Sequence, residues 1–119
     1  MKYVAVFIGG ALGGLTRFLL NDWLYGTALT FHRTLLMNMF GAFVLGWLVA
    51  RVADKKHPLY LGVTAGFLGA FTTFSAFSNE VLEMLQADMH QAAFVYSVTM
   101  FLVGLVSASL GMWIGRGKR

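Results

Sequence analysis

The sequence predicts an all-α integral membrane protein with four transmembrane helices, and its composition is the first reason. Hydrophobic residues make up 58% of the 119 residues, and the mean hydropathy is +0.70. Charged residues make up only 12%, whereas roughly a quarter is usual in soluble domains. So few charges cannot cover a water-facing surface. The chain contains no cysteine, which excludes disulfides and thiolate metal sites.

Four apolar segments, separated by polar breaks, follow one another along the chain. Each approaches the roughly 20 residues that a helix needs to cross about 30 Å of hydrocarbon. The first is expected to be a retained span, because its apolar run continues through Gly14 without a signal-peptide cleavage site. The expected spans, which form one domain over 1–119, are Tyr3 to Leu20, Thr34 to Ala50, Leu59 to Phe77 and Gln91 to Ile114. The expected breaks are Asn21-Asp22, His32-Arg33, Arg51 through Pro58 and Asn79 through His90.

Small residues recur at helical spacing in the first and fourth spans. Such residues let helix backbones approach closely in lipid, where the hydrophobic effect does not draw helices together. The pattern fits packing inside one subunit and a seam between two subunits equally well. The positions are Gly9, Gly10, Gly13 and Gly14 in the first span and Gly104, Ala108, Gly111 and Gly115 in the fourth.

Basic residues are concentrated on one side of the expected topology. With four spans, both termini and the connection after the second span share a side, whereas Arg33 lies opposite and Arg17 lies near the end of the first span. The positive-inside rule therefore places both termini in the cytoplasm. The basic pI of about 9.8 comes mainly from this rim and needs no nucleic-acid partner. The residues on the predicted cytoplasmic side are Lys2, Arg51, Lys55, Lys56, Arg116, Lys118 and Arg119.

Two polar side chains are expected inside the membrane. Asn38 lies about one turn into the second span, where an unpartnered amide would cost a few kcal/mol. It is therefore expected either to bond to another helix or to line a wet path. Arg17 is expected to extend toward the headgroups, to bond to a broken helix or to hold an anion.

The third span contains an unusual stretch, GFLGAFTTFSAFS, at 66–78. Gly66, Gly69 and the pair Thr72-Thr73 weaken the helix, since each glycine costs about 1 kcal/mol relative to alanine. Hydroxyl side chains can satisfy the backbone groups that a break releases. The stretch therefore predicts a broken helix, whose carbonyls would suit a small hard cation.

Phenylalanines recur at three-residue spacing around this break. Phe71, Phe74 and Phe77 are expected to share one helix face. Aromatic rings have electropositive edges, so a dehydrated anion could lie against them. A stripe that faces lipid or the core is the alternative.

Taken together, these stretches resemble the Fluc (CrcB-type) family of fluoride channels over essentially the whole chain. The matching pieces are GGALGGLTRF, TLLMNMFGAFVLG and GFLGAFTTFSAF, in the family's order and spans. The resemblance implies passive export of fluoride, and hence fluoride resistance. On this resemblance, Phe74 and Phe77 would contact fluoride and Asn38 would line the pore. Thr73 and Ser75 would form polar lining near the break.

The resemblance also implies an assembly and a cofactor. Two subunits would insert antiparallel in the cell membrane, with a structural sodium ion at the centre of the dimer. The backbone carbonyls of Gly69 and Thr72 would bind that sodium, and Arg17 would lie near the vestibule.

The fourth span departs from the family pattern. Tyr96 matches the start of a polar track, but the next positions at four-residue spacing are Met100 and Gly104, where the family often has small hydroxyl residues. The strong Lys/Arg bias is a second departure, because an antiparallel homodimer requires one sequence to insert both ways. We therefore expect either a homodimer or, favoured by the bias, a dimer with an oppositely oriented homologue.

Two other classes stay open. A small multidrug-resistance-type exporter shares the size and the antiparallel habit but needs a buried glutamate, and Glu80 and Glu83 are expected to follow the third span in a loop. A membrane assembly subunit without transport activity is the other class. An enzyme is not expected, because the sequence offers no paired carboxylates, metal cluster or nucleophile–base set.

Overall fold

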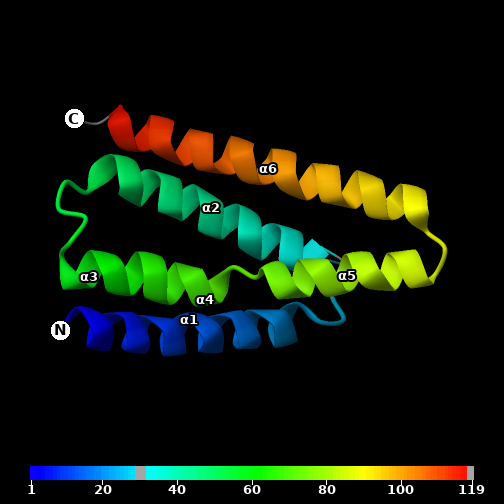
Figure 1. The fold of residues 1–119 in the computed structure, drawn as a ribbon, viewed down its shortest axis with the longest axis horizontal. Helices are drawn as coiled ribbons and strands as arrows, with labels where there is room; N and C mark the ends of the chain where they lie inside the picture. The colour runs from blue at the N-terminus through cyan, green and yellow to red at the C-terminus, as the bar shows by residue number, and fades with distance from the viewer. Residues whose placement is uncertain (29–31, 118–119) are drawn as a thin grey trace.

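The structure is a computed structural model that describes residues 1–28 and 32–117, and within these ranges it is all helix and connections. Four helical segments there are long and apolar enough to cross a membrane, and Figure 1 shows them side by side. This confirms the predicted all-α fold with four spans. The spans are α1 (Lys2–Leu24), α2 (Arg33–Arg51), α6 (His90–Arg116) and a composite third span of α3 (Pro58–Leu61), η2 (Gly62–Leu68), α4 (Gly69–Phe71) and α5 (Phe74–Gln86).

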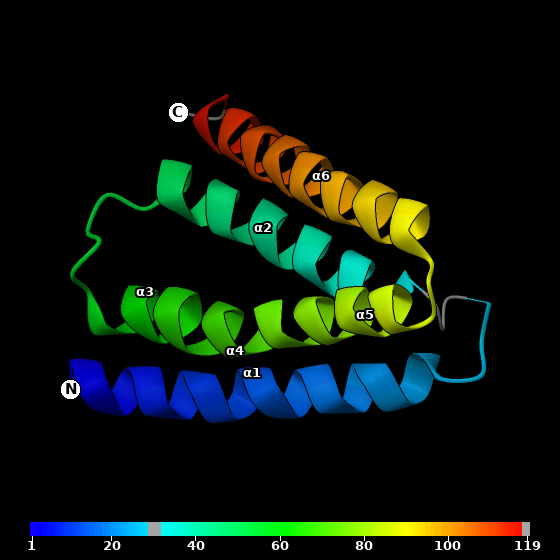
Figure 2. The same cartoon turned by 45° about the vertical axis from the view of Figure 1, so that its right-hand side comes forward.

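The first half of the third span packs tightly against α1 (Figures 1 and 2). Glycine makes this approach possible. A Cβ atom at Gly13 would lie 2.1 Å from the Phe67 carbonyl oxygen, and one at Gly9 would lie 2.0 Å from that of Gly62. The backbones of α1 and η2 are therefore in direct contact, as small residues allow in lipid.

The second tight pair is α2 with α6, on the other side of the bundle (Figure 2). A Cβ atom at Gly111 would lie 2.1 Å from the Phe43 carbonyl oxygen. Gly14 and Gly104 differ, since a Cβ at either would meet no atom within 4 Å. The small-residue stripes therefore serve packing within the subunit at Gly13 and Gly111, whereas Gly14 and Gly104 lie on open faces.

The third span is interrupted where the sequence predicts a break. Its residues Gly62–Leu68 are wound as a π-helix, a wide form that is rare and often found near functional sites. Thr72 (φ −78°, ψ 151°) and Thr73 (φ −145°, ψ 119°) are then extended, and Figure 1 shows the ribbon uncoiled between α4 and α5. The predicted broken helix is confirmed.

The three phenylalanines do not share one helix face, so that expectation is wrong for Phe71. Phe71 precedes the break, whereas Phe74 and Phe77 follow it in α5. The extended residues between them change the direction of the chain and the helical register. Phe71 is 3% exposed and packs on Phe67 and Phe40, with ring centroids 5.9 and 6.0 Å away. It belongs to the core.

The expected polar break from Asn79 through His90 is largely helical. The break at the threonines starts a new helix, and α5 continues to Gln86, nine residues past the predicted end of the span at Phe77. Only residues 87–89 connect α5 to α6. Glu80 and Glu83 therefore lie on a helix, which corrects their placement in a loop.

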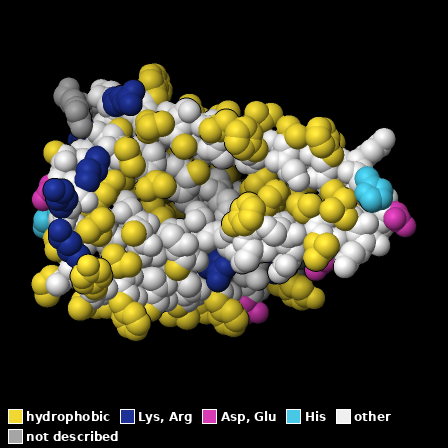
Figure 3. Space-filling model, in the orientation of Figure 1, with side chains coloured by type: hydrophobic (Ala, Val, Ile, Leu, Met, Phe, Trp, Pro, Cys, Tyr) yellow, Lys and Arg dark blue, Asp and Glu magenta, His cyan; other side chains and the backbone are white. Residues whose placement is uncertain are grey.

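Basic side chains gather at one end of the bundle. Both ends of the described chain and the connection from α2 to α3 lie at that end (Figure 1), and Figure 3 shows most of the visible Lys and Arg side chains there. The predicted common side for these segments is thus confirmed, whereas its cytoplasmic location stays a prediction. Lys118 and Arg119 lie outside the described residues.

The hydrophobic core is small for a chain this apolar. Large apolar side chains such as Phe7, Phe18, Phe74 and Phe101 are exposed instead, and apolar side chains cover much of the face in Figure 3. Such a surface is suited to lipid or to a second subunit rather than to water. The buried apolar side chains of the described residues are Met37, Ala50, Leu68, Phe71 and Ala93.

Candidate functional site

The helix break is closed by a side chain from α2. The backbone N–H of Thr73 donates to Asn38 Oδ1 at 2.9 Å, and Asn38 Nδ2 donates to the Thr73 carbonyl at 3.1 Å. Because Asn38 lies in the second turn of α2, that helix positions the amide directly against the break. Asn38 thus makes the helix-to-helix bond expected of a buried amide.

The hydroxyl groups at the break organise the start of α5. Thr73 Oγ1 accepts from the backbone N–H of Ala76 at 3.2 Å and is therefore the N-cap of that helix. It also lies 3.0 Å from Ser75 Oγ. Thr72 Oγ1 donates back to the Leu68 carbonyl at 2.8 Å. Thr73 and Ser75 thus form a bonded pair beside the break, and their role as polar lining of a fluoride pathway stays a prediction.

A cavity of about 330 Å³ opens next to the break, and Asn38 lines it. Several of the sequence-predicted site residues come close together there, since Phe74 lies 5.8 Å from Phe77 and Phe77 lies 5.5 Å from Tyr96 between ring centroids. Phe74 is 78% exposed, so its ring is open toward whatever lies beyond the chain. The residues that line the cavity are Asn38, Thr72, Thr73, Phe74, Phe77, Ser97, Met100 and Phe101.

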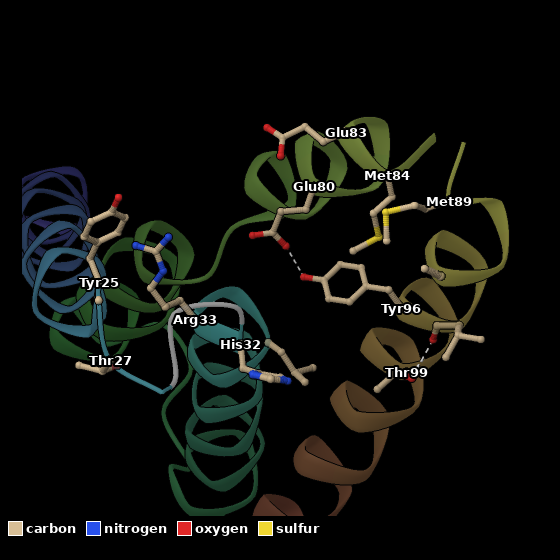
Figure 4. Close-up of a pocket in the computed structure, with 14 residues that line it drawn as sticks. Tyr25, Thr27, His32, Arg33, Glu80, Glu83, Met84, Met89, Tyr96 and Thr99 are labelled. Atoms are coloured by element: carbon tan, nitrogen blue, oxygen red, sulfur yellow. Dashed lines mark hydrogen bonds between the residues drawn. The ribbon is translucent and has the colours of Figure 1, made fainter. Parts of the chain in front are cut away.

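A larger cleft lies nearer the end of the bundle opposite the termini, and it contains a carboxylate held by two hydroxyls. Thr34 Oγ1 donates to one oxygen of Glu80, and the Tyr96 hydroxyl donates to the other. Figure 4 shows the Tyr96 hydroxyl pointing at Glu80 across the cleft, with Arg33 and Tyr25 on its far side. The cleft has a volume of about 1170 Å³. Tyr96 therefore links it to the aromatic rings beside the break.

Thr34 and Glu80 were not among the sequence-predicted site residues. Helical spacing could have indicated both, because Thr34 lies four residues before Asn38 and Glu80 lies three residues after Phe77. For Glu80, helical spacing is informative only if α5 is known to continue through that residue. The apolar run gives no such signal, since it ends at Phe77.

Arg17 lies apart from this cluster. It is a half-buried residue of α1 and lines neither the cavity beside the break nor the larger cleft. The arginine at the larger cleft is Arg33, whose guanidinium donates to the Asn21 carbonyl at 2.9 Å and lies 5.4 Å from the centroid of the Tyr25 ring. The placement of Arg17 at a vestibule stays a prediction.

Backbone oxygens at the break are candidate ligands for a cation. The described residues contain no group of three or more His, Asp or Glu side chains that could hold a metal ion. The N–H that would close the helical bond to the Gly69 carbonyl is that of Thr73, and it donates to Asn38 instead. Gly69 is also exposed, and Thr72 has left the helical conformation. These carbonyls therefore fit the ligand type that a hard cation prefers.

Comparison with known proteins places the chain in a family. The family model described as CrcB-like protein, Camphor Resistance (CrcB), matches residues 4–112. The chain belongs to this family. It is 40% identical to the fluoride-specific ion channel FluC 1 of Staphylococcus aureus over 98% of each chain. It is 39% identical to the fluoride-specific ion channel FluC 2 of Listeria monocytogenes, over 92% of this chain and 84% of that protein.

A third relative supports the same membership. The fluoride-specific ion channel FluC 1 of Staphylococcus epidermidis is 37% identical over 97% of each chain. The matched range of the family model contains the helix break, both cavities and almost all of the four spans. The family resemblance found in the sequence is thus confirmed.

Proposed function

We propose that this chain is a subunit of a fluoride channel, which passes fluoride out of the cell passively and is not an enzyme. The observation that carries this proposal is the cavity beside the break, where the Asn38 amide and the rings of Phe74 and Phe77 line one space. Relatives named fluoride-specific ion channels, about 40% identical over nearly the full length, support it.

The chemistry of the cavity suits a small, strongly hydrated anion. Fluoride must exchange its water shell for other positive partners, and ring edges and amide hydrogens are such partners. Phe74 and Phe77 are tilted at 54° to each other, so their edges are not hidden by face-to-face stacking. The adjoining hydroxyls of Thr73 and Ser75 add polar groups at the same level.

The functional unit is an antiparallel dimer. A single chain leaves Phe74 78% exposed. A second subunit would cover this face and complete the wall beside the cavity. The Lys/Arg bias supports an orientation with both termini in the cytoplasm, and it favours as partner a homologous subunit that inserts the other way.

A sodium ion is part of the proposed assembly, at the centre of the dimer. The supporting observation is the release of carbonyls at the break, because Asn38 takes the N–H of Thr73 from the helical pattern. The carbonyls of Gly69 and Thr72 would hold the ion, and the equivalent pair from the second subunit would complete its ligands. Sodium would supply positive charge there and hold two subunits together.

One observation favours a second candidate, a proton-coupled exporter of the small multidrug-resistance type. Glu80 lies within the helical third span and faces α2 and α6 through Thr34 and Tyr96. The sequence-based argument against an exporter relied on the absence of such a carboxylate. Passive conduction remains the proposal, because relatives over nearly the full length are named ion channels.

Fluoride efflux from liposomes that contain this chain, followed with a fluoride electrode, tests the proposal. Rapid fluoride efflux with chloride retained is expected. The variant Phe77→Leu is expected to slow efflux by about three- to tenfold, because it removes the ring edge. Phe94→Leu is the matched control, since Phe94 is 70% exposed and lines neither cavity. No efflux from folded protein, alone and with an oppositely oriented homologue, would contradict the proposal.

A further inference from the structure

Of the four polar side chains that line the cavity beside the break, those of Asn38, Thr72 and Ser97 have their hydrogens committed, and the Thr73 hydroxyl is paired with Ser75 Oγ at 3.0 Å. Asn38 Nδ2 donates both to the Thr73 carbonyl at 3.1 Å and to the Met100 sulfur at 3.8 Å. The hydroxyls of Thr72 and Ser97 each donate to a carbonyl one turn earlier in the chain, at 2.8 Å in both cases. An anion that enters this cavity must therefore displace an existing bond at each of these groups.

Met100 contributes a thioether to the same wall. Its sulfur is a weak acceptor and has no hydrogen to donate in any rotamer. Tyr96 lies one turn before Met100 and Gly104 one turn after it, so the three positions share a face of α6. The Tyr96 hydroxyl is committed to Glu80, and Gly104 has no side chain. This face of α6 thus offers an anion no uncommitted side-chain donor.

We propose that Met100 limits the rate at which fluoride moves through the cavity of this chain. The inference rests on the proposed channel function and identifies the residue that determines the rate in this particular subunit. At Met100 a fluoride ion finds a soft sulfur where it needs a hydrogen-bond donor. The side-chain amide that lines the cavity is that of Asn38. Its hydrogens are donated to the Thr73 carbonyl and to the Met100 sulfur, so fluoride must displace one of these two acceptors.

A hydroxyl at this position would remove the limit. A serine side chain can turn from its own helix carbonyl toward an ion, because hydrogen bonds to a charged acceptor are roughly twice as strong as neutral ones. Met100 is half-buried and its neighbour Gly104 has open space around it. A smaller polar side chain at position 100 therefore displaces no packed core group.

The experiment compares Met100→Ser with Met100→Leu in the liposome efflux assay. Met100→Ser is expected to raise the fluoride efflux rate by about three- to tenfold, the effect of one added hydrogen bond. Met100→Leu keeps the size and the apolar character and adds no donor, so no comparable increase in rate is expected. Measurable but equal efflux rates for all three proteins would overturn the inference, as would an equal increase with leucine.

A second readout keeps this test separate from the test of channel function. The side-chain amide resonance of Asn38, in protein labelled with ¹⁵N, is followed during a fluoride titration. The midpoint is expected at a fluoride concentration about three- to tenfold lower in Met100→Ser than in the unmodified chain. Equal midpoints would overturn the inference even if neither protein conducts. Conduction by neither protein, with shifted midpoints, would contradict the channel proposal alone.

Discussion

Asn38 and Thr73 exchange two hydrogen bonds, so that one side chain of α2 satisfies both the N–H and the carbonyl that the extended residue exposes. A neighbouring β-strand would supply the same pair of bonds. Close approach is possible because Gly41, one turn further along α2, has no side chain. A Cβ atom there would lie 2.2 Å from Cγ2 of Thr72. The break and α2 therefore form one structural unit.

The first prediction concerns this pairing. Asn38→Leu is expected to lower the free energy of unfolding by about 2–4 kcal/mol, because it leaves two part-buried backbone groups without partners. Chemical denaturation in detergent measures the change. Asn79→Leu is the control, since Asn79 lies on α5 and lines neither cavity. Equal stability of the two variants would show that the Asn38 bonds are not formed in solution.

The second prediction concerns the contact between α1 and η2. Gly13→Ala is expected to destabilise the fold by about 1–3 kcal/mol, the usual cost of overpacking, because its Cβ would lie 2.1 Å from the Phe67 carbonyl oxygen. Gly14→Ala adds the same methyl group where no atom lies within 4 Å, so little change is expected. Thermal unfolding of both proteins in one detergent checks the difference. A loss at Gly14 as large as at Gly13 would indicate that Gly14 is covered by a second subunit.

The four spans and the break could be predicted from the sequence because they depend on local properties. Apolar length indicates a span, and the density of glycine and threonine indicates a weak helix. The course of the chain after the break depends on tertiary packing and could not be predicted in the same way. Thr73 caps a new helix, and that helix carries Glu80 toward Thr34, a contact that depends on how α2 packs.

Several residues of the predicted site come together beside the break, whether they lie close to it in sequence or not. Phe74, Phe77 and Thr73 lie beside one cavity together with Asn38. The expectation that Phe71 shares a helix face with Phe74 and Phe77 is wrong because of the break itself. Two extended residues separate Phe71 from the following helix. Met100 lines the cavity as well, so the sequence departure on α6 lies at the site and not on a remote face.

The third prediction concerns the N-cap of α5. Thr73→Val keeps the shape of the side chain but removes the oxygen that accepts from Ala76 N–H, so a loss of about 1 kcal/mol is expected. Hydrogen exchange at the Ala76 amide is expected to become faster as well. Thr99→Val is the control, because that hydroxyl bonds within α6, to the Val95 carbonyl. Unchanged exchange at Ala76 would argue against the cap.

The fourth prediction concerns Glu80, whose two oxygens accept from Thr34 and Tyr96. Glu80→Gln keeps the shape but replaces one acceptor by a donor, so one hydroxyl loses its partner. A loss of about 1–3 kcal/mol in unfolding free energy is expected, whereas Glu83→Gln, at an exposed position of the same helix, is expected to change little.

The same variant separates the two candidate functions. For a channel, fluoride efflux by the unmodified chain is expected to be the same with and without a proton gradient across the liposome membrane. Glu80→Gln would then leave that independence intact, whatever its effect on rate, because no proton moves with the ion. An efflux that follows the proton gradient in the unmodified chain and ignores it in Glu80→Gln would instead make Glu80 the coupling carboxylate. That result would favour the exporter. In an exporter, Glu80 would gain a proton on one side of the membrane and release it on the other, and its hydrogen bonds with Tyr96 and Thr34 would differ between the two protonation states.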